Sequence, residues 1–368
     1  MQAEILCDHL QNTEVPVVLV LAGGGSTVLP PLLARGGGSR VLLACHIPYH
    51  PKSLTSYLQL KKPLVKTCSQ ETGLALSMRA FLEGYGWTAS EKMIGLSLTC
   101  VLPRRGTERE GREHRIFCSY QTESCTVIFG LHLAPGHSRE DAELLTRNLV
   151  LNTWSEACGL PHRLPLPLKE KDVLDRKIAV AEPALQAVLL GTSLAHPLVG
   201  SGEKPTVLFS SACNPFHQGH QRMIELAAQL TGKPVSLEIP LLNADKPPVD
   251  YLSLQERVES IRRLMEPKSL WVTGMRTFVE KARHWGGDLQ FIVGTDTAMR
   301  ICEPRFYGGE AGLAAALQEL RTLRCRFLCF ARGEEGSYPP AFREIAEFVP
   351  KATFWDPVSS TQLRGEGD

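Results

Sequence analysis

The chain has 368 residues, of which 43% are hydrophobic and 21% charged, and its formal net charge at pH 7 is +1. This balance is typical of a soluble globular protein and argues against a nucleic-acid or anionic membrane partner, because both attract strongly basic surfaces. At this length we expect two domains of about 100 to 200 residues each.

The N-terminal residues MQAEILCDHL lack the basic-then-apolar pattern of a secretory signal, and no run of 18 apolar residues is present to cross a membrane. The eleven cysteines are odd in number and contain no CxxC pair. Such cysteines do not resemble a disulfide framework or a zinc site. We therefore expect a cytoplasmic protein without a bound metal of its own.

The first half of the chain alternates predicted strands and helices. Apolar runs predict strands over residues 17–21, 40–45, 93–102, 116–121 and 125–132. Helical spacing of apolar residues predicts helices over residues 1–14, 70–84 and 138–159. Ser138 and Asp141 form a capping-box pattern at the start of the last helix. The charged segment 104–115 is interpreted as an exposed hairpin tip, so this half is predicted to be a mixed α/β domain.

Three glycines, Gly23 to Gly25, follow the first predicted strand and precede Ser26. A glycine turn before a helix can expose backbone N–H groups to a phosphate. This turn lacks both the lysine of the P-loop and the spacing of GxGxxG. A tight turn is therefore favoured over a phosphate cradle.

A connector is predicted between the two halves. Residues 161–167 contain three prolines, a helix is expected over 172–190, and the segment GTSLAHPLVGSGEKP is rich in glycine, serine and proline. The chain is accordingly divided into a first domain, a helical connector with linker, and a second domain, at residues 1–165, 166–203 and 204–368.

The second half alternates strands and helices at the spacing of a doubly wound parallel sheet. Strands are predicted over residues 206–210, 235–239, 289–293, 327–331 and 353–355, with one near Leu270. Helices are predicted over residues 220–230, 253–265 and 279–285, and after Gly294. In such a sheet ligands bind at the carboxyl ends of the strands, so the loops after residues 210, 239, 293 and 355 should line a site.

His217 and His220 lie in the sequence HQGH, where the first of these loops meets a predicted helix. Imidazole can donate hydrogen bonds to phosphate oxygens, which helix N-termini also attract. A metal would need a third ligand that the neighbouring sequence does not supply. Phosphate contact is therefore the better interpretation.

These residues resemble the HxGH nucleotidyltransferase superfamily, and within it the nicotinate and nicotinamide mononucleotide adenylyltransferases. The resemblance covers about residues 204–364. The matching segments are SACNPFHQGH, FIVGTD at 291–296, LCFARGEEG at 328–336 and SSTQLR at 359–364. It implies a Rossmann-like domain that binds ATP, or another nucleoside triphosphate, with Mg²⁺, and transfers a nucleotidyl group to a small phosphorylated acceptor.

The resemblance also implies roles for individual residues. Those of the catalytic machinery are His217, His220, Lys246 and Arg364. Those that contact the nucleotide are Ser210, Ser211, Asn214, Gly294, Asp296, Ser360 and Thr361. The histidines would stabilise the triphosphate, Lys246 and Arg364 its outer phosphates, and Asp296 the ribose or the cation. An aromatic side chain that stacks on a pyridine ring would be Phe306 or Tyr307.

Simpler interpretations remain open at several of these positions. Lys246 precedes two prolines and is compatible with plain exposure, while Ser360 and Asp296 are compatible with helix capping. Ser211 stands where the family has a glycine, which predicts crowding or an awkward backbone angle, and Cys213 replaces an aromatic residue. The chain also ends four residues after Arg364. A non-catalytic nucleotide-binding or regulatory protein is therefore the alternative function.

The first half more faintly resembles the C-terminal domain of the CinA family, some of whose members deamidate nicotinamide mononucleotide. The matching segments are LAGGGST at 21–27, PYHPKSL at 48–54, CSQETGLAL at 68–76 and GLSLTCVLP at 95–103. Ser26 matches the family's serine turn, but Lys52 falls at the wrong spacing from Tyr49. An altered or non-catalytic domain is favoured, an amidase centred on Ser26 is the third hypothesis, and a homo-oligomer is compatible with either.

Overall fold

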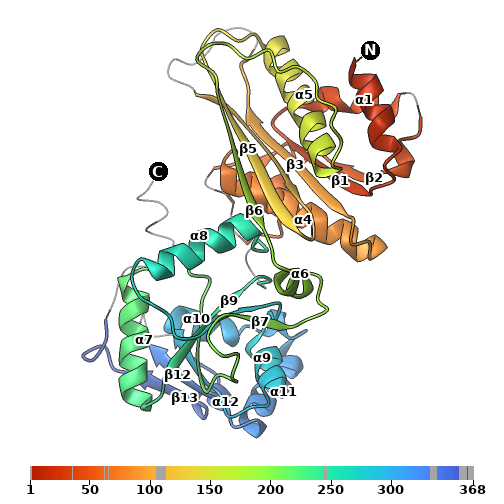
Figure 1. Cartoon of the computed structure of the whole chain (residues 1–368). Coiled ribbons are helices and arrows are strands. Elements are labelled where there is room, and N and C mark those ends of the chain that lie inside the picture. Colours follow the sequence, from red (N-terminus) through yellow and green to blue (C-terminus); the bar gives the residue numbers. More distant parts are fainter. Residues whose placement is uncertain are drawn as a thin grey trace. The chain divides into compact units, whose positions relative to one another are not determined.

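The computed structural model describes residues 2–34, 36–61, 63–64, 66–104, 113–243, 247–331, 338–355 and 363. They form two compact units, of which unit 1 comprises 1–182 with 245–253, and unit 2 comprises 183–244 with 254–368. Figure 1 labels most of the helices and strands of each unit. The predicted hairpin tip, at 105–112, and the predicted site residues Lys246, Ser360, Thr361 and Arg364 lie outside the described residues.

Unit 1 is built on a six-stranded sheet. Its strands are β1 (Val17–Ala22), β2 (Leu42–His46), β3 (Ile94–Val101), β4 (His114–Gln121), β5 (Cys125–Leu133) and β6 (Val173–Val180). Their order in the sheet is β2-β1-β3-β4-β5-β6. β1 pairs in parallel with β2 and β3, whereas the pairs from β3 to β6 are antiparallel. The five strands predicted from apolar runs are confirmed, and with the helices they form the predicted mixed α/β domain.

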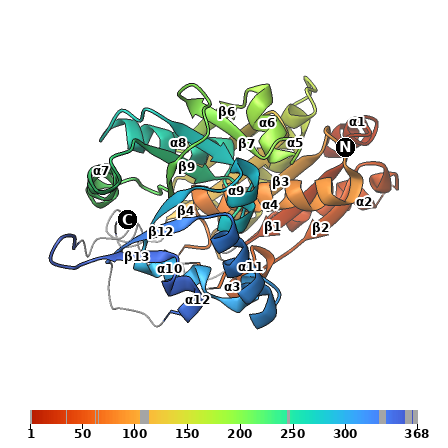
Figure 2. The same ribbon diagram turned by 90° about the horizontal axis from the view of Figure 1, so that it is seen from below.

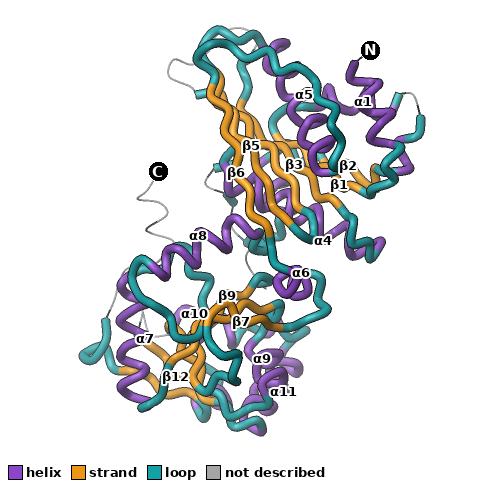
Figure 3. Tube along the Cα trace, viewed as in Figure 1, coloured by secondary structure: helices purple, strands orange, loops and turns teal. Residues whose placement is uncertain are grey.

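Helices cover both faces of this sheet. They are α1 (Gln2–Gln11), α2 (Leu29–Leu33), α3 (Pro51–Tyr57), α4 (Gln70–Thr88) and α5 (Arg139–Ala157), with 3-10 turns η1 (Ser26–Val28) and η2 (Gly38–Arg40). Side chains of α1 and α5 share one hydrophobic core with β1, β3 and β4. α4 covers the opposite face, as Figure 3 shows. The predicted capping box of Ser138 and Asp141 is present at the start of α5.

α4 lies unusually close to the sheet. A Cβ atom at Gly95 would be 2.1 Å from the carbonyl oxygen of Ser77, so only glycine fits on β3 at this point. The interface is also polar, because Ser77 Oγ lies 2.9 Å from Ser119 Oγ, and Ser97 Oγ donates to the carbonyl oxygen of Gly73 at 2.7 Å. Buried hydroxyl groups need such partners, and here they tie the helix to particular strands.

Two predictions in this region are wrong. The helix expected over 172–190 is replaced by the strand β6 and the short helix α6 (Pro183–Leu189). Residues of β6 are apolar at both helical and strand spacings, and pairing with the free edge of β5 selects the strand. The stop predicted at Gly84 is also wrong. α4 continues to Thr88, and Gly84 instead gives room to Met93, which a Cβ atom there would meet at 2.2 Å.

Unit 2 is built on a seven-stranded sheet. Its strands are β7 (Ala195–Val199), β8 (Val207–Ser210), β9 (Val235–Pro240), β10 (Leu270–Thr273), β11 (Gln290–Gly294), β12 (Arg326–Phe330) and β13 (Ala346–Val349). Their order is β13-β12-β11-β8-β9-β10-β7, and every pair is parallel except that of β10 with β7. β9 follows β8 in the chain and pairs with one edge of β8, whereas β11 comes later in the chain and pairs with the other edge of β8. β8 therefore stands at the switch point of a doubly wound sheet, which confirms the predicted fold class.

The helices of unit 2 lie on both faces of its sheet. After α6 they are α7 (Gln218–Thr231), α8 (Tyr251–Arg262), α9 (Phe278–Trp285), α10 (Thr295–Ile301), α11 (Glu310–Thr322) and α12 (Pro340–Arg343), with the 3-10 turn η3 (Pro304–Phe306). α9, α11 and α12 share one core with β8, β11 and β12, and Figure 2 shows α9 beside α11. The described part of the chain contains no helix that is long and apolar enough to span a bilayer.

The last strand predicted from the sequence is also misplaced. Residues 353–355 are not a strand, and the sheet ends instead with β13, at 346–349. Phe354 is nevertheless buried, because its ring packs edge-on against Phe330 at a centroid distance of 5.1 Å. The apolar character of this segment therefore serves side-chain packing rather than strand pairing. β7 also lies in the segment that was expected to be a linker.

A buried hydrogen-bonded pair of a histidine and an aspartate links two loops of unit 1. His137 Nε2 lies 3.0 and 2.9 Å from the two carboxylate oxygens of Asp172, and the two side chains are 1% and 0% exposed. The same carboxylate accepts backbone N–H groups of Ala134 and Lys169, each at 2.7 Å. Burial alone raises the pKa of Asp172, but these hydrogen bonds outweigh it and hold the pKa below its usual value.

We expect Asp172→Asn to lower the free energy of unfolding by about 2 kcal/mol, since hydrogen bonds to a buried charge are lost. The pKa of Asp172 is lower in the folded state than in the unfolded state, so the charged carboxylate stabilises the fold. This stabilisation is complete at pH values above the unfolded-state pKa, and it is lost as the pH falls through the folded-state pKa. The difference between wild type and variant in urea unfolding should therefore be full at neutral pH and shrink below pH about 4. Glu170→Gln, at an exposed neighbouring position, is the control and should show no such trend.

Candidate functional site

The loop that follows β8 forms the centre of the candidate site. Ser211 donates its backbone N–H to the carbonyl oxygen of Glu238 on β9, and its Oγ accepts the N–H of Cys213 at 3.3 Å. The left-handed conformation in this loop belongs to Cys213, whose φ is 48°, and not to Ser211. The awkward backbone angle anticipated for Ser211 is therefore absent, and its hydroxyl is turned toward its own loop. The peptide bond between Asn214 and Pro215 is cis.

The two histidines close the N-terminus of α7. His217 is the N-cap residue, and its Nδ1 accepts the backbone N–H of Gly219 at 3.1 Å. His220 Nδ1 in turn accepts the backbone N–H of His217 at 3.3 Å. Together they form a capping box, in which imidazole nitrogens take the place of the usual oxygen acceptors. Both side chains are buried, and their ring centroids lie 3.8 Å apart.

These hydrogen bonds determine which ring nitrogens carry a proton. Because Nδ1 of each ring is an acceptor, the hydrogen of a neutral ring must lie on Nε2. The ring of His220 is also held by packing, with Phe209 at 5.6 Å and Phe216 at 5.3 Å between centroids. The arrangement presents two oriented N–H donors at a helix N-terminus, where a negative charge is favoured.

α8 braces this loop from the side. Arg257 Nη1 donates to the carbonyl oxygen of Ala212 at 3.0 Å, and the N–H of Phe216 donates to Ser260 Oγ at 3.1 Å. The hydroxyl of Ser260 then donates to the carbonyl oxygen of Arg257 at 2.7 Å. The sequence predicts the helix but gives no sign of these contacts, because they join side chains to backbone groups more than forty residues away.

A buried ion pair lies at the carboxyl end of β8 and β9. Lys281 Nζ is 2.9 Å from a carboxylate oxygen of Glu238 and donates to Ser210 Oγ at 2.8 Å. The other carboxylate oxygen accepts the hydroxyl of Thr273. The side chains of Lys281 and Glu238 are only 3% and 0% exposed. Sequence reasoning missed this pair, although a glutamate inside an apolar strand and a lysine inside an amphipathic helix were possible signals.

Gly294 and Asp296 stand in the next loop of the same edge. β11 pairs in parallel with β8, so the loop after Gly294 is adjacent to the loop after Ser210. Gly294 is the N-cap residue of α10, and Asp296 lies exposed in the first turn. The capping role considered for Asp296 is therefore wrong. Phe306 lies in η3, against the guanidinium of Arg305 at 4.0 Å.

The structure thus brings together seven of the predicted site residues at one edge of the sheet. They are Ser210, Ser211, Asn214, His217, His220, Gly294 and Asp296. Among the residues that the structure describes, no group of three histidine, cysteine or acidic side chains is arranged to hold a metal ion. All eleven cysteines are free thiols, and burial raises the pKa of Cys329 to about 12, so this thiol stays protonated.

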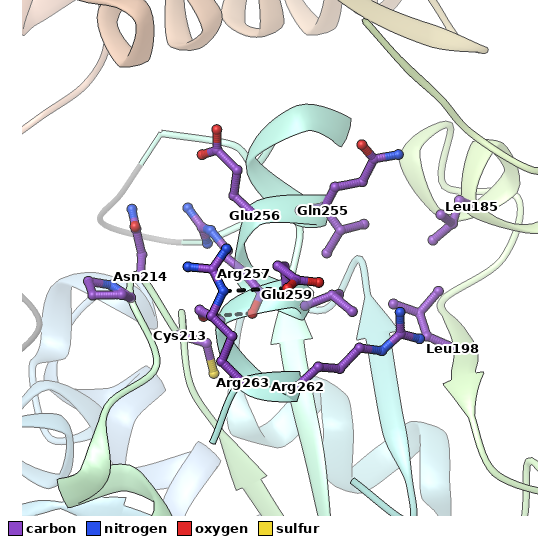
Figure 4. Close-up of a pocket in the computed structure, with 14 residues that line it drawn as sticks. Leu185, Leu198, Cys213, Asn214, Gln255, Glu256, Arg257, Glu259, Arg262 and Arg263 are labelled. Carbon is purple, nitrogen blue, oxygen red and sulfur yellow. Dashed lines mark hydrogen bonds and ion pairs between the residues drawn. The ribbon is translucent and has the colours of Figure 1, made fainter. Parts of the chain in front are cut away.

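A cavity of about 790 Å³ opens beside the loop. Figure 4 shows Asn214 on one side of it and the arginines of α8 on the other. Arg263 is paired with Glu259 at 3.4 Å, and Arg257 is bound to the loop. Within the described parts of the chain, Arg262 has no ion-pair partner and is exposed. The wall of the cavity can therefore offer a guanidinium group to an anionic ligand.

The glycine turn of unit 1 is arranged differently. The N–H of Gly25 donates to a carboxylate oxygen of Glu143 at 3.0 Å, and Arg139 binds the other oxygen at 2.7 Å. The carboxylate of Glu143 therefore occupies the position beside the turn that a bound phosphate would need. This arrangement favours the interpretation of the segment as a tight turn over that of a phosphate cradle. Ser26 is exposed at the start of η1, and in the described chain no hydrogen bond joins it to Tyr49 or Lys52. This geometry adds no support to the amidase hypothesis.

The candidate site thus combines a largely parallel sheet with a switch-point loop that ends in two histidines at the start of a helix. Residues 211–366 match the family model described as cytidylyltransferase-like, and this part of the chain is a cytidylyltransferase-like domain of the HxGH nucleotidyltransferase superfamily. The match confirms the resemblance that the sequence motifs indicate for the C-terminal half.

Solved structures similar to the chain come from the CinA family. The competence/damage inducible protein CihA from Agrobacterium tumefaciens is 12% identical, with a TM-score of 0.33, over 43% of this chain and 96% of its own. A CinA superfamily protein from Klebsiella pneumoniae is 8% identical, with a TM-score of 0.34, over 43% of this chain and 99% of its own. The comparison with curated proteins gave no match.

The buried pair beside the loop should be essential for the stability of unit 2. We expect Lys281→Met and Glu238→Gln each to lower the free energy of unfolding by about 3 kcal/mol, because each leaves a buried charge or polar group without its partner. The double variant should lose much less than the sum of the two. Urea unfolding of the four proteins measures the coupling.

The exposed ion pair of Asp288 and Arg324 provides the control for this cycle. Asp288→Asn should leave the urea midpoint nearly unchanged, because solvent screens a surface pair. Single variants of the buried pair that unfold at the wild-type midpoint would contradict the assigned role.

Proposed function

We propose that the chain is a nucleotidyltransferase. It would transfer adenylyl from ATP, or another nucleotidyl group, to a phosphate-bearing acceptor such as nicotinamide or nicotinate mononucleotide, and release pyrophosphate. The observation that carries the proposal is the pair of buried imidazoles of His217 and His220 at the N-terminus of α7, each of which accepts a backbone N–H at Nδ1. A neutral ring held in this way carries its hydrogen on Nε2. The matching family model supports the reaction class, and the substrates are our inference.

The reaction needs no covalent group on the protein. A phosphate oxygen of the acceptor attacks the α-phosphorus of the triphosphate, the bond between the α-phosphorus and its bridging oxygen breaks, and pyrophosphate leaves with the electron pair. Charge builds on the oxygens around the α-phosphorus and on the leaving group. Oriented N–H donors that are already desolvated stabilise that charge without reorganisation, which is the main contribution a protein can make here.

The residues around the loop fit the binding of a triphosphate with its cation. Mg²⁺ in such sites is held largely by phosphate oxygens and water, with one or two carboxylates. Asp296, in the first turn of α10, is an exposed carboxylate at this edge of the sheet, whereas the carboxylate of Glu238 is buried against Lys281. When bound, the cation would neutralise the outer phosphates. Lys246, Arg364, Ser360 and Thr361 keep the phosphate-binding roles that the family resemblance implies.

The cavity beside the loop suits the acceptor. It shares Asn214 with the histidine loop and carries Arg262 on the opposite wall. A guanidinium group and an amide at such a site favour a phosphate monoester, which offers several acceptor oxygens. Leu185 and Leu198 add apolar surface for the rest of the molecule.

The alternative is a nucleotide-binding protein without catalysis. The observation in its favour is the polar side chain of Ser211, which stands in a turn where the family has glycine. Incubation with Mg²⁺, each nucleoside triphosphate and a panel of phosphorylated acceptors separates the two functions. Pyrophosphate release with one pair supports transfer. No release with any pair, together with measurable ATP binding, would rule out transfer and support the alternative.

We expect His217→Ala and His220→Ala each to lower the rate of pyrophosphate release by about 10²- to 10³-fold, because one donor to the transition-state charge is removed. ATP affinity, measured by calorimetry, should fall less than the rate does. His284→Ala changes an exposed histidine on α9 and is the control, with activity equal to wild type. Equal activity of the loop variants and wild type would refute the proposed role of the pair.

We expect Arg262→Ala to raise the KM for the phosphorylated acceptor about tenfold while kcat and the KM for the triphosphate stay near wild type, since only acceptor binding loses a contact. Arg263→Ala should have a smaller effect, because Arg263 is already paired with Glu259. Arg321→Ala, on the exposed face of α11, is the matched control. Steady-state kinetics with each substrate varied in turn provide the measurement. A raised KM for the triphosphate alone would place the acceptor elsewhere.

A further inference from the structure

We propose that two copies of the chain associate edge to edge through β6, in an antiparallel pair that joins their unit 1 sheets. This inference is independent of the proposed reaction. It concerns the outer edge of β6, residues 173–180, which we call the β6 edge.

The β6 edge is an unusual surface for a monomeric protein. β6 is the last strand of the unit 1 sheet, so among the described residues no strand pairs with its outward backbone groups. Four of its aliphatic side chains are exposed, by 58%, 38%, 44% and 67% in the order Val173, Leu174, Ile178 and Val180. An eight-residue edge strand with exposed aliphatic residues is a template for pairing with another strand. It carries neither a proline nor a bulge, which are common protections of such edges.

The side chains of β6 divide between the two faces of the sheet. Asp175 lies over Gly130, on the α4 face, and Lys177 Nζ donates to Gln70 Oε1 of α4 at 2.7 Å. Arg176 lies on the α5 face, where it pairs with Glu156 at 2.8 Å. By the alternation of a strand, Leu174 and Ile178 share the face of Arg176.

The sequence VLDRKIAV is complementary to itself in one register. A two-fold axis perpendicular to the sheet keeps each face of one sheet continuous with the same face of the other. It must therefore lie midway between one residue and the copy of that residue, and residues at equal distances before and after that residue then lie opposite each other. With the axis at Arg176, Asp175 lies opposite Lys177 of the second copy, and Leu174 lies opposite Ile178. Each opposite pair occurs twice, so the register places two ion pairs on the α4 face and two aliphatic pairs on the α5 face.

The neighbouring symmetric registers are disfavoured by charge. An axis at Asp175 would place two carboxylates opposite each other, and an axis at Lys177 would place two ammonium groups opposite each other. In the favoured register two Arg176 side chains meet at the axis, and the ion pair of each with its own Glu156, at 2.8 Å, offsets part of their repulsion. This self-complementarity, in both charged and aliphatic pairs, identifies a second copy of the chain as the occupant of the β6 edge.

Charge reversal on the full-length chain tests the proposal. Sedimentation equilibrium should show a concentration-dependent dimer for wild type. Asp175→Lys and Lys177→Asp should each raise the dissociation constant at least about tenfold, because two attractive cross-strand pairs become repulsive. The variant with both changes restores opposite charges in the same register and should dimerise like wild type.

Mixing the two single variants gives a further readout. Positions 175 and 177 are then both basic in one variant and both acidic in the other, so the charges attract across the pair. A heterodimer should therefore form at concentrations where each variant alone is monomeric. Circular dichroism melts of all variants show that the fold is intact. A wild-type monomer throughout, a dimer insensitive to the single changes, or loss of dimerisation without recovery in the double variant would each overturn the proposal.

Discussion

The hydrogen bonds from the backbone of α7 to His217 and His220 are the interaction on which the candidate site depends. A helix N-terminus leaves backbone N–H groups without partners, and a side chain must satisfy them when the end is buried. Here two imidazole Nδ1 atoms do so. The same bonds leave the hydrogen of each neutral ring on Nε2 and fix the ring planes. A requirement of local structure and a requirement of phosphate chemistry are therefore met by the same two residues.

The surroundings of the loop explain how these donors keep their positions. α8 holds the backbone of the loop through Arg257 and Ser260, and β9 holds it through the carbonyl oxygen of Glu238. The carboxylate of Glu238 is neutralised in the interior by Lys281, which also binds Ser210. In a buried setting such charge-assisted bonds are strong and tolerate little rearrangement. These contacts therefore hold the loop that carries His217 and His220 in a fixed position at the carboxyl end of β8.

The two units use similar local patterns to different ends. In each of them a buried strand runs into a polar turn, and a helical segment follows. In unit 1 the turn closes on Glu143, a carboxylate from α5, so its N–H group is already satisfied by an anion of the protein itself. In unit 2 the corresponding turn ends in histidine donors. This contrast places the candidate phosphate chemistry in unit 2 and leaves the glycine turn of unit 1 a structural role.

The sequence by itself determined the features that depend on neighbouring residues. Apolar runs located the strands around His217, and the capping residues Ser138 and Asp141 located the start of α5. The motif with its two histidines, together with FIVGTD, LCFARGEEG and SSTQLR in the same order, was enough to name the superfamily. The roles assigned to Asp296 and the other nucleotide-facing residues remain predictions.

The tertiary structure decided what depends on partners distant in the chain. Residues 173–180 have an ambiguous pattern, and only the free edge of β5 made them a strand. Residues 353–355 look like a strand, but Phe354 found a packing partner in Phe330 instead. Lys281 and Glu238 are 43 residues apart, and no local pattern joins them. Side chains so far apart meet only after the sheet has formed, because its strand order, which no single segment encodes, determines which strand ends become neighbours.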